Sequence, residues 1–136
     1  MAIWQVAFKL IPSDSIDFAD TFMLDPQSLK QLENDLPRSQ SWSDDNLLYG
    51  LLDNTCVELF YFESKLDEIS VRIHAGETSP KRICCIEKFA INNNLRILYN
   101  NEIVSASIGN ISDIIKNSKA FSYVHNSGEF WNSLNE

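Results

Sequence analysis

The side chains in this chain that could carry nucleophilic catalysis are two histidines and three cysteines. Cys84 and Cys85 follow two basic residues at the start of an expected helix, a setting that can lower a thiol pKa. His74 alternates with strand residues and His125 stands at a helix junction, and neither lies in a G-x-S-x-G or C-G-x-C context. Packing of the cysteines and a surface position for His74 are the favoured interpretation. An enzyme that uses Cys84 or His74 stays open as an alternative, but we assign no catalytic residue.

Paired carboxylates, the other groups that could do chemistry, occur at Asp44-Asp45 and at Asp67-Glu68. General acid–base work needs two carboxyl groups that face each other in different environments, whereas neighbours in a loop point apart. The segment Asp44-Asp45-Asn46 also lacks the glycine and the distal glutamate of a calcium loop. The four glycines are isolated, so no glycine-rich phosphate loop is present. We therefore expect neither a metal nor a cofactor.

The charge distribution is the feature of the composition that indicates a partner. Residues 14–77 carry fourteen Asp and Glu against four Lys and Arg, while the rest of the chain is close to neutral. Such a field repels nucleic acid and anionic membranes, and it attracts basic proteins. An aromatic anchor ringed by acids would suit such an interface, and Phe60 and Phe62 lie on the second face of an expected strand. The candidate partner-binding residues are Trp42 as the anchor and Asp44, Asp45, Asp53, Asp67 and Glu68 as the charged rim.

Length and composition indicate one folded domain over residues 1–136. The chain is 44% hydrophobic with eight Phe, three Trp and four Tyr, and it has only four Gly and four Pro. No apolar run approaches the ~18 to 20 residues of a membrane-spanning helix, and the N-terminus lacks the features of a signal peptide. An odd number of cysteines, two of them adjacent, favours reduced thiols in a cytoplasmic protein.

Hydrophobic periodicity predicts an α+β domain with a mainly antiparallel sheet and helices packed on it, in the order β-α-β-β-α-β-β-α-α. Thr55 to Glu63 and Leu66 to Ala75 are expected to form a hairpin near the middle of the sheet, turning at Ser64-Lys65. The segment from Cys56 to Phe62 is apolar on both faces, which predicts a strand covered on two sides. The other expected strands are Ile3 to Ile11, Leu95 to Tyr99 and Glu102 to Ser107, the last two joined at Asn100-Asn101.

Four helices are expected around these strands, and Arg38 to Asn46 is expected to be a turn-rich loop. Two helices begin with a cap followed by proline, at Asp25-Pro26 and at Ser79-Pro80. The helix from Pro80 should pack on the sheet through Ile83, Ile86 and Phe89. A third helix, capped by Asn110 or Ser112, should bury Ile111, Ile114 and Ile115, and a last one from Ser127 should bury Phe130, Trp131 and Leu134.

From Cys56 onward the chain resembles the small immunity proteins of bacterial polymorphic toxins, including contact-dependent growth inhibition systems. Three segments carry the resemblance: the hairpin VELFYFESKLDEISVRIHA, the strand LRILY, and the ending NSKAFSYVHNSGEFW with Ser118, Ala120, Tyr123, Val124, Phe130 and Trp131. Asn126-Ser127 replaces the Asp-Pro usual before the last helix, and residues 1–55 match nothing. The resemblance implies a cytoplasmic antitoxin that blocks its cognate toxin sterically, through surfaces that vary within such families.

Together, the resemblance and the acidic field predict an immunity protein that binds and neutralises a cognate toxin domain. The toxin domain is expected to be a nuclease, because nucleases bind polyanions and are basic. The alternative is a small-molecule or ligand-binding α+β module without catalytic activity, with a pocket between the sheet and the helices.

Overall fold

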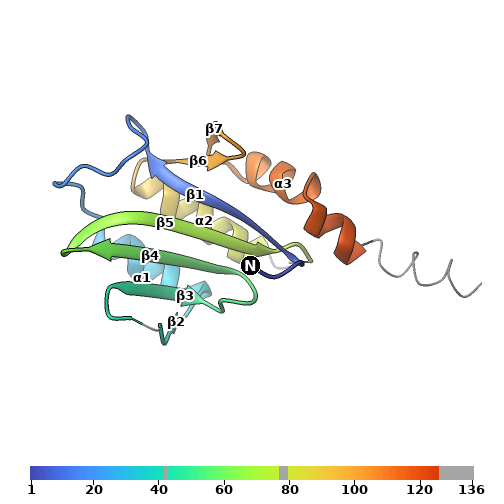
Figure 1. Ribbon diagram of the computed structural model, residues 1–136, viewed down its shortest axis with the longest axis horizontal. Coiled ribbons are helices and arrows are strands. Elements are labelled where there is room, and N and C mark those ends of the chain that lie inside the picture. The colour runs from blue at the N-terminus through green and yellow to red at the C-terminus, as the bar shows by residue number, and fades with distance from the viewer. Residues whose placement is uncertain (42, 77–79, 126–136) are drawn as a thin grey trace, which may run out of the picture.

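Within residues 1–41, 43–76 and 80–125, which the computed structural model describes, seven strands form one antiparallel sheet (Figure 1). Their order across the sheet is β2-β3-β4-β5-β1-β6-β7. This confirms the predicted α+β single domain with a mainly antiparallel sheet. The strands are β1 (Gln5–Pro12), β2 (Arg38–Ser39), β3 (Asn46–Gly50), β4 (Cys56–Phe62), β5 (Lys65–His74), β6 (Leu95–Tyr99) and β7 (Glu102–Ser105).

The hairpin of β4 and β5 lies near the middle of the sheet, as predicted. Val57 and Leu59 on β4 pair with Val71 and Ile69 on β5, and all four side chains are fully buried. The turn is Glu63-Ser64, one residue earlier than predicted, because Phe62 pairs with Lys65. Both turn residues have positive φ, 51° and 67°, which fits the right-handed twist of a two-residue hairpin loop.

Helices α1 (Pro26–Asp35) and α2 (Pro80–Asn92) pack on one face of the sheet (Figure 1). Asp25 caps α1 as predicted, since its carboxylate accepts a hydrogen bond from the backbone N–H of Gln27 at 3.2 Å. Phe89 and Ile86 of α2 are buried in the core at 1% and 0% exposure, as their spacing predicts, whereas Ile83 is half-buried. Helix α3 (Ile108–Lys116) packs against α2, and residues 119–125 are also helical.

The region between α1 and β4 and the start of α3 also differ from the prediction. The expected loop from Arg38 to Asn46 contains β2 and leads into β3, so the observed order is β-α-β-β-β-β-α-β-β-α up to α3. Strand β3 was missed because its five residues lack β-branched side chains and end in glycine. Helix α3 begins earlier than expected, because the hydroxyl of Ser107 accepts from the backbone N–H of Asn110 at 3.1 Å. The predicted helix from Ser127 lies outside the described residues.

The second face of the sheet has no helix over it in the described part of the chain (Figure 1). The prediction that β4 is covered on two sides is therefore wrong. Cys56 and Glu58 on this face are buried, but Phe60 is half-buried and Phe62 is 68% exposed. We call this surface the open face. None of the helices described is long and apolar enough to cross a bilayer.

Candidate functional site

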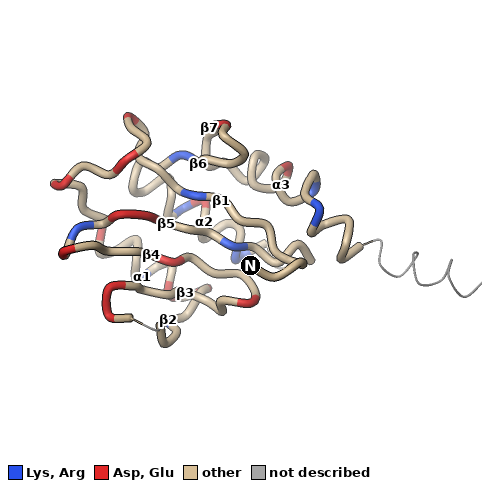
Figure 2. The backbone as a smooth tube through the Cα atoms, in the orientation of Figure 1, with Lys and Arg blue, Asp and Glu red and all other residues tan. Residues whose placement is uncertain are grey.

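Four neighbouring strands of the sheet end together at a surface rich in carboxylates. Strand β3 begins there, β4 and β5 turn there, and β1 leaves it for the loop 13–25 that leads to α1. Strands β3, β4, β5 and β1 are adjacent, so at ~4.8 Å per strand they span about 14 Å. Figure 2 shows acidic residues gathered toward this end. We define the acidic end as Asp14, Asp17, Asp20, Asp44, Asp45, Glu63, Asp67 and Glu68.

Two lysines partly neutralise the acidic end. The ammonium group of Lys9 lies 2.7 Å from a carboxylate oxygen of Glu68, and that of Lys65 lies 3.1 Å from Asp20. The second pair connects the loop 13–25 to the β4–β5 hairpin, although both side chains are largely exposed and such pairs contribute little stability. Eight acids against these two lysines leave six negative charges on one end of the molecule.

The loop 13–25 folds against the edge of the open face. Ile16, Asp17 and Phe18 line a depression of about 100 Å³ together with Asp67 and Glu68 from β5. The rings of Phe18 and Phe22 pack edge to face within the loop, with their centroids 4.8 Å apart, and this contact stabilises the loop. Three acids from two segments far apart in the sequence therefore line one concave site, together with Lys9, which pairs with Glu68.

Exposed apolar side chains stand among these acids. Phe62, at the tip of the hairpin, is 68% exposed, and Ile16 in the loop is 60% exposed. Phe60 is opposite Glu68 in the sheet and lies on the open face with Phe62. A large apolar side chain surrounded by charge has the composition of a protein-binding surface, with an anchor at the centre and a polar rim.

The structure brings together four of the six residues predicted from the sequence. Asp44 and Asp45 precede β3, and the backbone carbonyl of Asp45 accepts from the N–H of Tyr61 at 2.8 Å, beside the end of β4. Asp67 and Glu68 lie at the start of β5, in the same acidic end. Asp53 does not belong to it, because it follows β3 at the other end of the sheet, where its carbonyl accepts from the indole N–H of Trp4 at 2.8 Å. The predicted anchor Trp42 lies outside the described residues.

The acids of the loop 13–25 were not among the binding residues predicted from the sequence. Its segment Ile16-Asp17-Phe18-Ala19-Asp20 mixes acids with apolar residues, which is a signal for an exposed mixed surface. Phe62 was considered with Phe60 as an aromatic of the interface, but Trp42 was chosen as the anchor because Phe62 was expected on a covered strand face. Its exposure depends on which face the helices cover, and local sequence does not determine that.

The carboxyl group of Glu58 is buried on the open face. Glu58 is opposite Ser70 in the sheet, two residues along β5 from Glu68 of the acidic end. The side chain of Glu58 is 5% exposed. Burial raises the pKa of Glu58, the positive charge of Arg72 opposes this shift, and the negative charge of Glu68 adds to it. Glu58 therefore tends toward its neutral form more readily than an exposed glutamate.

The cysteines and histidines have positions that suit packing. Burial raises the pKa of Cys56 to about 11 and that of Cys85 to about 12, so both thiols stay protonated at neutral pH and are poor nucleophiles. The Nδ1 atom of His74 accepts from the backbone N–H of Gly76 at 2.9 Å. The ring of His125 stacks on Phe121 with centroids 4.0 Å apart. Among the residues described, no cluster of His, Cys, Asp and Glu is arranged to hold a metal ion.

Comparison with known proteins gave no match: no family model, no curated protein and no solved structure is detectably similar to this chain.

Proposed function

We propose that this chain is an immunity protein that binds a cognate toxin domain with a basic surface, a nuclease, and blocks it sterically. One observation carries the proposal: the acids of the loop 13–25, of the residues before β3 and of the β4–β5 hairpin converge on one end of the sheet, around the exposed Phe62. Such a surface matches a partner that is basic at its rim and has an apolar pocket at its centre.

The charge of the acidic end also suits fast capture of the partner. Six net negative charges within a region about 14 Å wide produce a field that acts on a basic partner within the Debye length, which is ~8 Å at physiological salt and longer at low salt. Steering of this kind raises association rates by ten- to a thousandfold at low salt. An antitoxin benefits from such rates because it must bind the toxin before the toxin reaches its substrate.

The proposal places the protein in the cytoplasm. The three cysteines are free thiols, which agrees with a reducing compartment. A nuclease that enters or is made in the cell reaches nucleic acid there, and its inhibitor has to be present in the same compartment.

Co-expression with the product of the gene immediately upstream tests the proposal. That product is expected to arrest growth when expressed alone, and this chain is expected to restore growth. Rescue should be lost when Phe62 is replaced by Ala or Asp45 by Lys, and it should be retained when Asp53, at the other end of β3, is replaced by Lys. Growth arrest that this chain does not relieve would refute the assignment for that partner. Equal loss of rescue by Asp45→Lys and Asp53→Lys would refute the acidic end as its binding surface.

A further inference from the structure

A groove lies between helices α1 and α2, which contact each other along the same face of the sheet. Lys81, Cys84 and Lys88 line it from α2, at spacings of three and four residues that place side chains on one face of a helix. Gln31 and Asn34 line it from α1. Its volume of about 870 Å³ is within the ~300 to 1,000 Å³ of ligand-binding sites. At ~30 Å³ for each water-sized unit, it has room for about thirty non-hydrogen atoms, or roughly four residues of a peptide.

A buried asparagine joins the two helices at one end of the groove. The side chain of Asn93, just after α2, accepts from the backbone N–H of Asp25 at 2.8 Å and donates to the hydroxyl of Ser28 at 2.9 Å. The side-chain amide of Asn92 also donates to Oε1 of Gln31 at 3.4 Å. The start of α1 therefore lies beside the end of α2, and the helices are antiparallel. A groove with walls fixed in this way loses little conformational freedom when a ligand binds.

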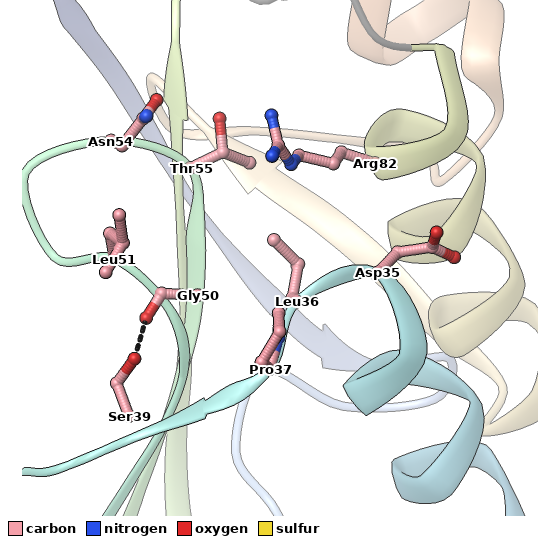
Figure 3. A pocket seen from close by; sticks show the side chains of 9 residues that line it. All are labelled: Asp35, Leu36, Pro37, Ser39, Gly50, Leu51, Asn54, Thr55 and Arg82. Atoms are coloured by element: carbon pink, nitrogen blue, oxygen red, sulfur yellow. Dashed lines mark hydrogen bonds between the residues drawn. The ribbon is translucent and has the colours of Figure 1, made fainter.

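Asp35, the last residue of α1, marks the other end of the groove. Its side chain extends from α1 toward α2 (Figure 3). Burial and, after it, the negative charge of Asp35 raise the pKa of Cys85, which lies on α2. Asp35 also lines the smaller neighbouring cavity of about 250 Å³ that Leu36 and Leu51 border (Figure 3). It is the one acid among the described residues that line the groove.

The groove has an apolar floor and a positively charged rim. Leu32, Cys85 and Phe89 line it and are buried. Lys81 and Lys88 are exposed, and neither ammonium group forms an ion pair with a residue that the structure describes. This rim stands out in a chain with a net charge of −8. It therefore favours a ligand that carries negative charge.

The spacing of the two lysines matches an extended peptide. The seven residues from Lys81 to Lys88 correspond to about 10.5 Å along α2. A peptide in polyproline II geometry has three residues per turn and rises ~3.1 Å per residue, so side chains three residues apart point the same way, about 9.3 Å from each other. Two acidic side chains at this spacing reach both lysines.

We propose that this groove binds a short acidic segment of a partner protein, with two carboxylates three residues apart. The carboxylates pair with Lys81 and Lys88 in charge-assisted hydrogen bonds. The side-chain amides of Gln31 and Asn34, on the opposite rim, bond to the backbone of the segment, because an amide offers both donors and an acceptor. This site is independent of the acidic end and of the proposed immunity function.

A nucleic acid matches the groove less well than an acidic peptide. Phe89 is the one aromatic ring among the described lining residues, and its burial leaves no exposed ring on which a base could stack. The net charge of −8 also repels a polyanion.

Titration with the peptide acetyl-Glu-Ala-Leu-Glu-amide, followed in amide NMR spectra, tests the proposal. At ~0.15 M salt the Debye length of ~8 Å screens the acids outside the groove. The matched control is acetyl-Gln-Ala-Leu-Gln-amide, which has the same shape without the charges. The acidic peptide is expected to bind with a Kd of ~1 mM or below, about fivefold or more tightly than the control. Equal affinity, or no binding of the acidic peptide up to ~10 mM, would overturn the proposal.

Two double variants locate the binding site. Lys81→Gln with Lys88→Gln is expected to weaken binding of the acidic peptide about fivefold or more and to leave binding of the glutamine peptide unchanged. Lys30→Gln with Lys119→Gln is the matched control, because both lysines are exposed and neither lines the groove. Equal losses in the two double variants would overturn the assignment to this groove. Thermal melts monitored by circular dichroism check that both are folded.

The thiol of Cys84 gives a second readout of the location. Cys84 is half-buried and lies between Lys81 and Lys88 on the wall of the groove. Saturating acidic peptide is expected to slow its alkylation by iodoacetamide several-fold, whereas the glutamine peptide at the same concentration is expected to leave the rate unchanged. An unchanged rate in the presence of bound acidic peptide would overturn the assignment to this groove.

A single-stranded tetranucleotide, titrated in the same way, distinguishes the two classes of anionic partner. It is expected to bind more weakly than the acidic peptide. Tighter binding of the tetranucleotide would overturn the assignment to a protein segment.

Discussion

Replacement of Phe89 by Ala tests the packing of α2 on the sheet. Phe89 is 1% exposed and, among the residues that the structure describes, it is the largest of the fully buried side chains. Loss of the ring removes its burial and leaves a cavity, which together cost ~3 to 5 kcal/mol for Phe→Ala in a core. A domain of this size has a free energy of unfolding of ~5 to 15 kcal/mol. The change therefore removes about a fifth or more of the free energy of unfolding, and it should lower Tm by roughly 10 to 20 °C.

Ile91→Ala in the same helix is the matched control. Ile91 lies two residues after Phe89 and is 59% exposed, so its truncation should change the free energy of unfolding by less than about 0.5 kcal/mol. Chemical denaturation measures both variants, with an unchanged m-value as the sign that the two-state comparison holds. A loss below about 1 kcal/mol for Phe89→Ala, or an equal loss for both variants, would refute the orientation assigned to α2.

Two further predictions concern titratable groups. Burial raises the pKa of Glu58, so the ionised side chain destabilises the folded state. The free energy of unfolding therefore falls as the pH rises through the folded-state pKa of Glu58. Glu58→Gln should therefore be more stable than the wild type at pH 7, despite the nearby charge of Arg72, and the difference should vanish below about pH 4 in denaturation curves; lower stability at pH 7 would contradict this. Iodoacetamide should modify the half-buried Cys84 before Cys56 and Cys85 in the native protein, and equal rates by peptide mass mapping would refute their burial.

The elements that the sequence predicted correctly have strong local signals. Strands β4 and β5 have a long apolar run and a clear alternation, α1 begins at Asp25-Pro26, and β6 and β7 are joined by Asn100-Asn101 with φ of 49° and 64°. Strands β2 and β3 were missed because they are short and depend on pairing, β3 with β4 and β2 with β3. For such strands the contact with a neighbour decides the structure, and that contact is not local in sequence.

The candidate site could be predicted in composition but only in part in geometry. The excess of acids between residues 14 and 77 is visible in the sequence, and Asp44, Asp45, Asp67 and Glu68 do share one end of the sheet. Asp53 was grouped with them because it is close to Asp45 in sequence. Strand β3 lies between the two residues and places them at opposite ends of the sheet, which closeness in sequence does not show. The exposure of Phe62 follows from the packing of α1 and α2 on the other face, which depends on the topology of the whole domain.

The association rate with the basic toxin domain, measured by stopped flow as a function of salt, tests the central claim most directly. Asp45→Lys and Asp53→Lys each reverse one exposed charge at opposite ends of β3. The account predicts that the rate falls steeply between ~0.01 and ~0.15 M salt as the Debye length shrinks from ~30 to ~8 Å. It also predicts that Asp45→Lys slows association several-fold at low salt, while Asp53→Lys changes it by less than about twofold. A rate that does not depend on salt, or equal slowing by the two variants, would contradict binding through the acidic end.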